Sequence, residues 1–270
     1  LPIGIHKNGI ATVVTIHDLI FMRHPEYYSK IDAWLYKMKF RRTCREADRF
    51  IAISECTKRD IMELGRVDED KITVVYQSCA SRYNTLLNNL QLNTILWDLS
   101  LPQRYILSVS TIEERKNIAL VVSALKMLPE NVHFVAVGRQ TKYVSKVLTQ
   151  AKKMGVEHRI HLLSGINDEQ LHAVYQLAEV FVYPSRYEGF GIPIIEAIQC
   201  GLPVVAATGS CLEEAGGPDC LYVSPDDVNG MAQAICKQMQ GAEGREERIL
   251  RSREYVKRFE GDSVARQVAA

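Results

Sequence analysis

From residue 104 onward, short apolar runs alternate with amphipathic stretches at a regular spacing. The apolar runs have the length of buried strands, and we expect strands at Tyr105–Ser110, Val132–Val137, Arg159–Leu163, Glu179–Tyr183, Pro203–Ala206 and Cys220–Val223. The stretches between them predict helices at Lys116–Leu128, Lys142–Met154, Asp168–Leu177 and Pro193–Cys200, with another after Asp227. Six strands separated by helices indicate a doubly wound parallel sheet with right-handed crossovers.

The first part of the chain shows the same alternation over a shorter length. We expect strands at Ala11–Ile16, Arg49–Ile53 and Lys71–Tyr76. Between the first two lies a predicted helix, Tyr28–Glu46, whose apolar face is formed by Ile31, Trp34, Leu35 and Met38. Parallel strands need cover on both faces and at both edges. Too little sequence precedes Ala11 to supply it, so we expect further strands upstream of this chain.

These patterns predict an α/β protein built from two Rossmann-like domains with doubly wound parallel sheets, the first of them incomplete. We place the first domain at 1–78 and a linker at 79–103, where Asn-, Leu- and Ser-rich sequence interrupts the alternation. The second domain covers 104–240. Residues 241–270 are expected to form helices that pack back towards the first domain.

Composition narrows the functional classes. The chain has 270 residues, of which 47% are hydrophobic and 24% charged, with a net charge of +1. These values are ordinary for a globular protein and give no reason to expect a nucleic-acid partner. No apolar run approaches the 18 or more residues that a membrane span needs. The seven scattered cysteines without CxxC spacing favour a reduced, cytoplasmic compartment.

One stretch of the second domain carries most of the chemistry. It reads PSRYEGFGIPIIEAIQCGLPVVA from Pro184 to Ala206, which predicts a strand end, a Gly-rich turn, a helix and a strand. Free amides at the start of that helix, near Gly191 and Ile192, bind anions such as phosphate. Glu188 and Glu196 stand on either side and suit a ligand with hydroxyls on both sides of a phosphate. Alternatively, Glu188 is a turn residue and Glu196 a carboxylate favoured by the helix dipole.

Three other positions are candidates for the same site. Arg115 and Lys116 fall where a helix is predicted to begin, a placement unfavourable for cations unless an anion neutralises them; otherwise they are surface cations. Gly138 follows the second strand of this domain, where it admits a nucleoside base or ribose or simply forms a turn. His17 ends a strand of the first domain, at the edge where doubly wound sheets bind ligands. Its alternative is a histidine satisfied at a strand end.

A metal site is not expected. The Asp68–Asp70 stretch spells a DxD but lies in a charged turn, far in sequence from the phosphate-binding candidates. His158 and His161 alternate through a strand without a third ligand nearby, so zinc is improbable.

The Pro184–Ala206 stretch resembles the signature of glycosyltransferase family 4, a family of retaining, metal-independent enzymes with the two-domain GT-B fold. The resemblance implies that Glu188 contacts hydroxyls of the donor sugar and that Glu196 holds the nucleotide ribose. The intervening loop, formed by Gly189, Phe190, Gly191 and Ile192, completes the donor site. Lys116 with Arg115 matches the cations that hold the donor diphosphate, and His17 matches a histidine that faces the donor sugar from the first domain.

The TIEERKN turn from Thr111 to Asn117 also resembles a mannosyltransferase-like subgroup, which has Ser-Thr where many members carry Gly-Arg. The implied function is transfer of a hexose, mannose favoured and GDP-mannose the first guess, to a glycan or lipid-linked acceptor with retention of configuration. We expect Glu188, Lys116 and His17 to be catalytic, with no cofactor besides the nucleotide sugar. Polysaccharide or lipopolysaccharide biosynthesis is the expected context.

Two other functions stay open: a sugar-nucleotide epimerase of the same fold, which would convert donor without any acceptor, and a non-catalytic or truncated remnant. A further partner is suggested by the predicted helix and its continuation to Arg49, where seven basic residues stand against three acidic ones. Such a segment suits an anionic membrane surface, which would place the protein peripherally on the inner face of the cell membrane. A solvated face is the simpler interpretation.

Overall fold

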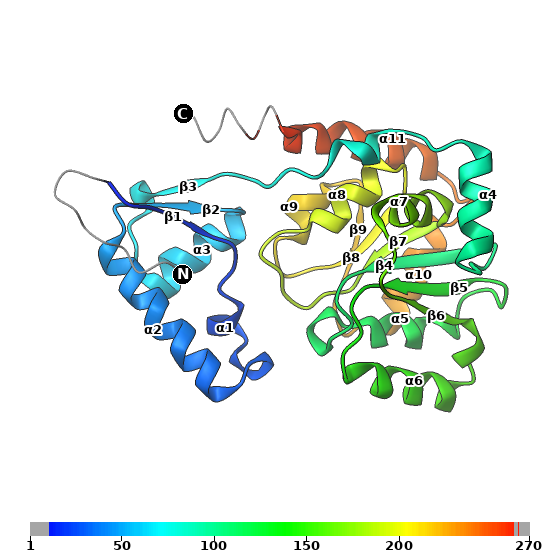
Figure 1. The fold of residues 1–270 in the computed structure, drawn as a ribbon, viewed down its shortest axis with the longest axis horizontal. Coiled ribbons are helices and arrows are strands. Elements are labelled where there is room, and N and C mark those ends of the chain that lie inside the picture. The colour runs from blue at the N-terminus through cyan, green and yellow to red at the C-terminus, as the bar shows by residue number, and fades with distance from the viewer. Residues whose placement is uncertain (1–10, 262–263, 265–270) are drawn as a thin grey trace.

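The computed structural model describes residues 11–261 and 264, which form two α/β units joined by a long connection (Figure 1). The first unit contains β1 (Val13–Ile16), α1 (Ile20–Arg23), α2 (Lys30–Glu46), β2 (Arg49–Ala52), α3 (Glu55–Gly65) and β3 (Ile72–Val74). Its three strands are parallel in the order β1-β2-β3, with Val14 opposite Phe50 and Phe50 opposite Ile72. All three strands lie where the sequence predicts them.

Strand alternation explains the core of the first unit. In β1 and β2 every second residue is buried, so that Val14, Ile16 and Phe50 face the same apolar cluster. Helix α2 closes this cluster with Phe40, which is fully buried.

The apolar face predicted for α2 is wrong. Ile31, Trp34 and Met38 are 77%, 62% and 47% exposed, whereas the helix buries Phe40 and Thr43. The helix packs through that side on α1 and α3, which leaves its most apolar stripe on the outside of the unit. Periodicity correctly predicts one apolar stripe, but the surface that the helix actually packs against decides which stripe is buried.

The connection at 79–103 contains more structure than a linker sequence suggests. A 3₁₀ turn at Ser81–Asn84 leads to α4 (Asn89–Asp98), whose start is fixed by a capping box between Asn88 and Gln91. Helix α4 packs against α7 of the second unit, and Ile95 is buried there.

The second unit is a six-stranded parallel sheet in the order β6-β5-β4-β7-β8-β9. Its strands are β4 (Tyr105–Val109), β5 (His133–Val137), β6 (Ile160–Leu163), β7 (Val180–Tyr183), β8 (Val204–Ala207) and β9 (Leu221–Val223). Its helices are α5 (Ile118–Leu125), α6 (Tyr143–Met154), α7 (Asp168–Leu177), α8 (Ile192–Gln199), α9 (Leu212–Gly216), α10 (Val228–Gln238) and α11 (Arg245–Val256). The predicted doubly wound α/β class and all six predicted strands are therefore confirmed.

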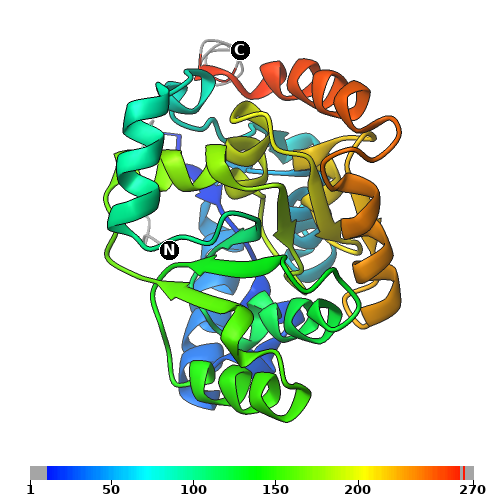
Figure 2. The same cartoon turned by 90° about the vertical axis from the view of Figure 1, so that its right-hand side faces the viewer.

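Helices cover both faces of this sheet, and the strands serve two cores by alternation. Leu107 and Phe181 belong to the cluster under α7 and α8, whereas Ile106 and Val182 belong to the cluster with α5, α6 and α10. Figure 2 shows α4 and α11 on one side of the sheet and α5 and α6 on the other. Both strand faces are buried, which is why these strands read as continuous apolar runs.

The chain returns towards the connection after the sheet is complete. Helix α11 packs on α8 and α9, and the turn Lys257–Phe259 follows it. There the Phe259 ring packs edge-on against Tyr76, just after β3, and against Phe190. No helix within residues 11–261 has the length and apolar character required to cross a bilayer.

Candidate active site

The strand order reverses between β4 and β7, and this switch point is where open α/β sheets bind ligands. Beyond the carboxyl end of β4 the chain forms a 3₁₀ turn, Glu114–Lys116, and α5 begins only at Ile118. The predicted helix start at Lys116 is therefore two residues early, because Asn117 takes a left-handed conformation with φ 56°. The side-chain amide of Asn117 donates to the carbonyls of Pro184 and Pro225, which holds this turn against the loop after β7.

Three of the predicted site residues meet at this point. Lys116 Nζ lies 2.5 Å from Glu188 Oε1, and Arg115 Nη1 lies 2.9 Å from Glu188 Oε2. Ser185 Oγ adds a hydrogen bond of 2.6 Å to Oε1, and Lys116 also donates to the Tyr183 hydroxyl at 3.2 Å. The carboxylate of one loop and the two cations of the other thus form one cluster, which we call the Glu188 cluster.

Burial and charge act in opposite directions on Glu188. The residue is only 9% exposed, and burial alone would raise the pKa of its carboxyl. The charges of Lys116 and Arg115 and the hydrogen bonds from Lys116 and Ser185 outweigh that effect, so the pKa is lowered. The Glu188 carboxylate raises the pKa of Arg115 against the effect of burial. Arg115 also pairs with the Glu113 carboxylate at 2.9 Å, so the two cations face two carboxylates and these four side chains carry no net charge.

Glu196 has a different environment from Glu188. Its Oε2 accepts a hydrogen bond of 2.8 Å from the hydroxyl of Tyr175, a fully buried residue of α7. Burial is the largest influence and raises the pKa of Glu196, although the Tyr175 hydrogen bond opposes it. Among residues 11–261, no hydrogen bond or ion pair joins Glu196 to the Glu188 cluster. Glu188 and Glu196 therefore differ in their hydrogen-bonding partners as well as in their positions.

The glycine-rich loop between the two carboxylates is tightly packed. Gly191 is the N-cap residue of α8, and Ile192 and Pro193 form its first turn, as the sequence predicts to within one residue. The Phe190 ring is 5% exposed and stacks on Tyr76. That ring belongs to the core, so only the backbone of Phe190 is left to contact a donor.

Gly138 lies at a cavity of about 690 Å³ beyond the carboxyl ends of β4, β5 and β6. The cavity is lined by Val109, Ser110, Thr111, Val137, Gly138, Arg139, Gln140, Ser164, Gly165, Ile166 and Leu171. A Cβ at Gly138 would overlap the Ser110 carbonyl, and its φ of 150° disfavours other residues. Glycine is required here because the ends of β4 and β5 approach closely.

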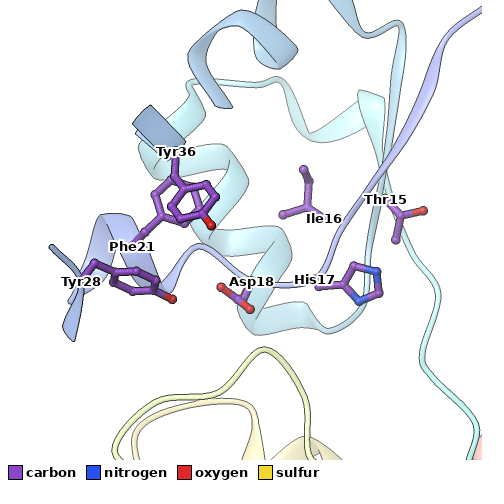
Figure 3. Close-up of a pocket in the computed structure, with 7 residues that line it drawn as sticks. All are labelled: Thr15, Ile16, His17, Asp18, Phe21, Tyr28 and Tyr36. Atoms are coloured by element: carbon purple, nitrogen blue, oxygen red, sulfur yellow. The ribbon is translucent and has the colours of Figure 1, made fainter. Parts of the chain in front are cut away.

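A second cavity, of about 370 Å³, lies in the first unit at the end of β1 (Figure 3). It is lined by Thr15, Ile16, His17, Asp18, Phe21, Tyr28 and Tyr36. The rings of Phe21, Tyr28 and Tyr36 gather on one side of Asp18, and the His17 imidazole points to the other side. His17 Nδ1 lies 3.4 Å from Gln77 Nε2. Sequence reasoning missed Asp18 and the three aromatic residues, although His17-Asp18 stand together at a strand end.

The two units meet at the loop that carries Glu188. A Cβ at Gly189 would overlap the carbonyl oxygen of His17, so glycine allows the backbones of the two units to touch. A third cavity, of about 250 Å³, lies beside this contact, with Tyr28 of the first unit and Arg115 of the second among its lining residues. The backbone of His17, the Glu188 cluster and the aromatic cavity therefore lie around one junction.

Comparison with known protein families places two domains on this chain. The model of glycosyl transferases group 1 matches residues 97–254, and the model of glycosyltransferase family 4 matches residues 2–78. The first covers the second unit and the second covers the first unit, in the order that the fold shows.

Known relatives match most of the chain. O-antigen chain mannosyltransferase B of Escherichia coli is 30% identical over 94% of this chain and 68% of the relative. O-antigen chain mannosyltransferase RfbU of Salmonella typhimurium is 26% identical over 94% of this chain and 67% of its own length. Among solved structures, Anabaena Alr3699/HepE in complex with UDP and glucose superposes with a TM-score of 0.83 at 20% identity, covering 96% of this chain and 70% of that one. That likeness shows the GT-B fold predicted from the sequence.

Proposed function

This chain belongs to the group 1 glycosyl transferases, and from that premise we propose that it moves a hexose from a nucleotide-diphosphate sugar to a glycan or lipid-linked acceptor with retention of configuration. The observation that carries the proposal is the Glu188 cluster, where Lys116 and Arg115 converge on one buried carboxylate at the switch point. A site with two adjacent side-chain cations and a hydroxyl-binding carboxylate suits an activated sugar, in which a polyol is attached to a diphosphate.

The proposed chemistry depends on how charge develops. As the bond between the sugar and the β-phosphate breaks, negative charge grows on the departing nucleoside diphosphate. Lys116 and Arg115 stabilise that charge, together with backbone amides at the start of α8 beside Gly191 and Ile192. Two side-chain cations thereby take the role that a divalent metal has in other transferases, so we propose that the reaction requires no metal.

We propose a placement for the donor that uses the cavities. We assign the nucleoside to the cavity beside Gly138, with Glu196 holding the ribose and Glu188 the sugar hydroxyls. Mannose is favoured because relatives covering most of this chain are O-antigen mannosyltransferases. The HepE complexes contain UDP, so GDP and UDP are both tested below.

The acceptor sugar is assigned to the aromatic cavity of Figure 3. Flat rings such as those of Tyr28 and Tyr36 pack against the apolar face of a pyranose, and the Asp18 carboxylate accepts hydrogen bonds from hydroxyls. His17 lines this cavity, and its carbonyl lies against Gly189 of the Glu188 loop; we propose that it approaches the donor sugar from the first unit. Cell-surface polysaccharide or lipopolysaccharide is the proposed product.

A membrane surface is the proposed setting, and α2 is the element that would contact it. The outer face of α2 combines exposed Ile31, Trp34 and Met38 with the basic residues Lys30, Lys37, Arg41, Arg42 and Arg45. Apolar side chains next to lysine and arginine suit the interface of an anionic bilayer. Figure 1 shows α2 on the outer side of the first unit, away from the second.

Vesicle binding tests this assignment. The chain has two tryptophans, Trp34 and Trp97, so a Trp97→Phe variant reports on Trp34 alone. Its emission is expected to shift to the blue with vesicles of phosphatidylglycerol and phosphatidylcholine and not with phosphatidylcholine alone. Ile31→Ser should weaken binding, and the control Leu90→Ser, which alters a similarly exposed leucine of α4, should not. An unshifted emission with anionic vesicles contradicts the assignment.

The transferase proposal is tested with nucleotides first. GDP or UDP is expected to raise the melting temperature in the presence of EDTA, and Lys116→Ala is expected to abolish the rise. If Lys116→Ala folds poorly, the Lys116→Ala/Glu188→Gln double variant removes both charges of the pair and serves the same purpose. A nucleotide response that survives in both variants contradicts the diphosphate assignment. Incubation with the nucleotide sugar alone distinguishes an epimerase, which converts donor without acceptor.

A further inference from the structure

The residues on either side of Glu188 are held by the other unit. The carbonyl of Gly189 accepts hydrogen bonds from Ser54 Oγ at 2.7 Å and from Thr57 Oγ1 at 3.3 Å. On the other side, the Tyr187 hydroxyl donates to Asp60 Oδ2 at 2.6 Å. Ser54, Thr57 and Asp60 all belong to the start and first turns of α3. One helix of the first unit therefore forms hydrogen bonds with the loop of the second unit immediately before and immediately after Glu188. We call these hydrogen bonds of Ser54, Thr57 and Asp60 the α3 contacts.

Asp60 is the central residue of the α3 contacts. It is 3% exposed, and its second oxygen accepts a hydrogen bond of 2.7 Å from Arg23 Nε. Tyr187 is 9% exposed, so the bond between Tyr187 and Asp60 is shielded from water. A hydrogen bond from a hydroxyl to a buried carboxylate is strong, and losing either partner leaves a buried polar group unsatisfied. The chain Arg23–Asp60–Tyr187 thus runs from α1 to the residue before Glu188.

The second unit also contributes a side chain that binds α3. The first two backbone amides of α3, those of Glu55 and Cys56, donate to the Glu214 carboxylate of α9 at 2.7 and 2.8 Å. A carboxylate at a helix N-terminus satisfies amides that have no partner within the helix. The second unit therefore caps α3, and α3 in turn holds the Glu188 loop.

We propose that Asp60 is a positioning residue that acts through Tyr187 to place Glu188 against the donor sugar, so that the carboxylate adopts its working position only when the two units are closed. The proposal rests on the function above, in which Glu188 binds sugar hydroxyls. Lys116 and Arg115 belong to the second unit, and among residues 11–261 no hydrogen bond or ion pair joins either cation to α3. Arg115 Nη1 donates to the Tyr187 carbonyl at 2.6 Å, a backbone contact that does not involve the Tyr187 hydroxyl. Loss of the α3 contacts should therefore weaken binding of the sugar part of the donor and leave binding of the nucleotide part unchanged.

Calorimetric titration of nucleotides with and without the sugar separates these effects. GDP and GDP-mannose are titrated into wild type, Tyr187→Phe and Asp60→Asn, with UDP and UDP-glucose in parallel. We expect Tyr187→Phe to weaken the sugar nucleotide about tenfold while the affinity for the free diphosphate changes less than twofold. Asp60→Asn keeps only one acceptor oxygen for its two donors, Tyr187 and Arg23, so it should also weaken the sugar nucleotide, but by less than Tyr187→Phe. Glu188→Gln should weaken the sugar nucleotide relative to the free diphosphate.

Two further variants test whether a loss of affinity in Tyr187→Phe is specific to the α3 contacts. Tyr105→Phe removes a comparable tyrosine hydrogen bond, to the Val174 carbonyl within the second unit, and should leave both affinities unchanged. Thr57→Val removes a hydroxyl donor to Gly189 without changing side-chain shape, and it replaces Tyr187→Phe if that variant folds poorly. Unchanged affinity for the sugar nucleotide in Tyr187→Phe and Thr57→Val overturns the inference, as does an equal loss for the free diphosphate. A wild type that binds none of the four nucleotides contradicts the proposed function itself.

Discussion

The loop before α8 contains Glu188 and the first turns of α8 contain Glu196, and the two carboxylates have opposite electrostatic environments. Glu188 faces two cations, which lower its pKa although burial acts the other way. Glu196 is half-buried next to Tyr175, and burial raises its pKa. The first is therefore held as an anion by charge, and the second is held mainly by a neutral hydroxyl.

This difference in environment indicates which role each carboxylate suits. In the proposed reaction Glu188 lies where charge changes, and we expect its cations to contact both the diphosphate and the carboxylate. No ion pair joins Glu196 to another of residues 11–261, so it suits a fixed hydrogen-bonding task such as the proposed holding of a ribose. The two also differ in what surrounds them: the loop of Glu188 touches the first unit, whereas Glu196 is contacted by Tyr175 within its own unit.

The strongest disruption of this contrast is expected from Gly189→Ala. The added methyl would overlap the His17 carbonyl, so the two units must separate while the surroundings of Glu196 stay intact. Misplacing a catalytic group by about 1 Å costs on the order of 100-fold in rate, and we expect a loss of transfer of that size. Small-angle scattering should show a more extended particle. Gly261→Ala, where the methyl meets nothing within 4 Å and the backbone is not left-handed, is the control, and an unchanged scattering curve for Gly189→Ala would be evidence against the described contact.

Lys116→Ala tests the charged environment through stability. Removing one partner of a buried ion pair leaves the carboxylate undercompensated, and we expect a loss of about 3 kcal/mol in the free energy of unfolding measured by urea denaturation. Adding Glu188→Gln should restore part of that loss because the remaining group is neutral. If the double variant is less stable than the single one, the pair does not carry the proposed coupling.

Single hydroxyl deletions compare the two environments directly. Tyr175→Phe removes the hydrogen bond to Glu196 and should cost about 2 kcal/mol of unfolding free energy. Ser185→Ala removes one of three contacts to Glu188, two of which come from cations, and should cost about 1 kcal/mol. The reverse order in urea denaturation would show that Glu196 has stronger partners than the structure indicates.

The smallest predicted effect is a difference between the two glutamates in the pH dependence of the free energy of unfolding. The lowered pKa of Glu188 gives stability that is present above about 4.5, its ordinary value, and is lost as the pH falls through the folded-state pKa. The raised pKa of Glu196 gives stability that is present below about 4.5 and is lost as the pH rises through the folded-state pKa.

Urea denaturation between pH 3 and pH 7 measures both trends. The advantage of wild type over Glu188→Gln should grow as the pH rises, and the advantage of wild type over Glu196→Gln should shrink. Parallel curves for the two variants would refute the contrast between the carboxylates.

Much of this architecture can be predicted from local sequence. The six strands of the second unit are short apolar runs, of which the four central ones are buried on both faces. The strand ends at Val109 and Tyr183 fall within one residue of the prediction. The meeting of Lys116 with Glu188 follows from the same pattern, because both residues come after neighbouring parallel strands. The family resemblance then suggests what that meeting is for.

Other features depend on contacts distant in sequence. The exposure of Trp34 arises because α2 packs through Phe40, and helical periodicity does not reveal which side meets a neighbour. The bond between Tyr187 and Asp60 joins residues 127 positions apart, and neither residue type signals it. The capped helix α4 was hidden by a composition typical of a linker, although its Asn88 and Gln91 form a recognisable capping box.

A crystal structure of the protein with GDP or UDP bound, grown in EDTA, tests the central claim most directly. We predict that the β-phosphate lies within about 3 Å of Lys116 Nζ and a guanidinium nitrogen of Arg115, with the ribose hydroxyls at Glu196. A diphosphate bound away from both cations, with the Lys116–Glu188 pair undisturbed, would contradict the account.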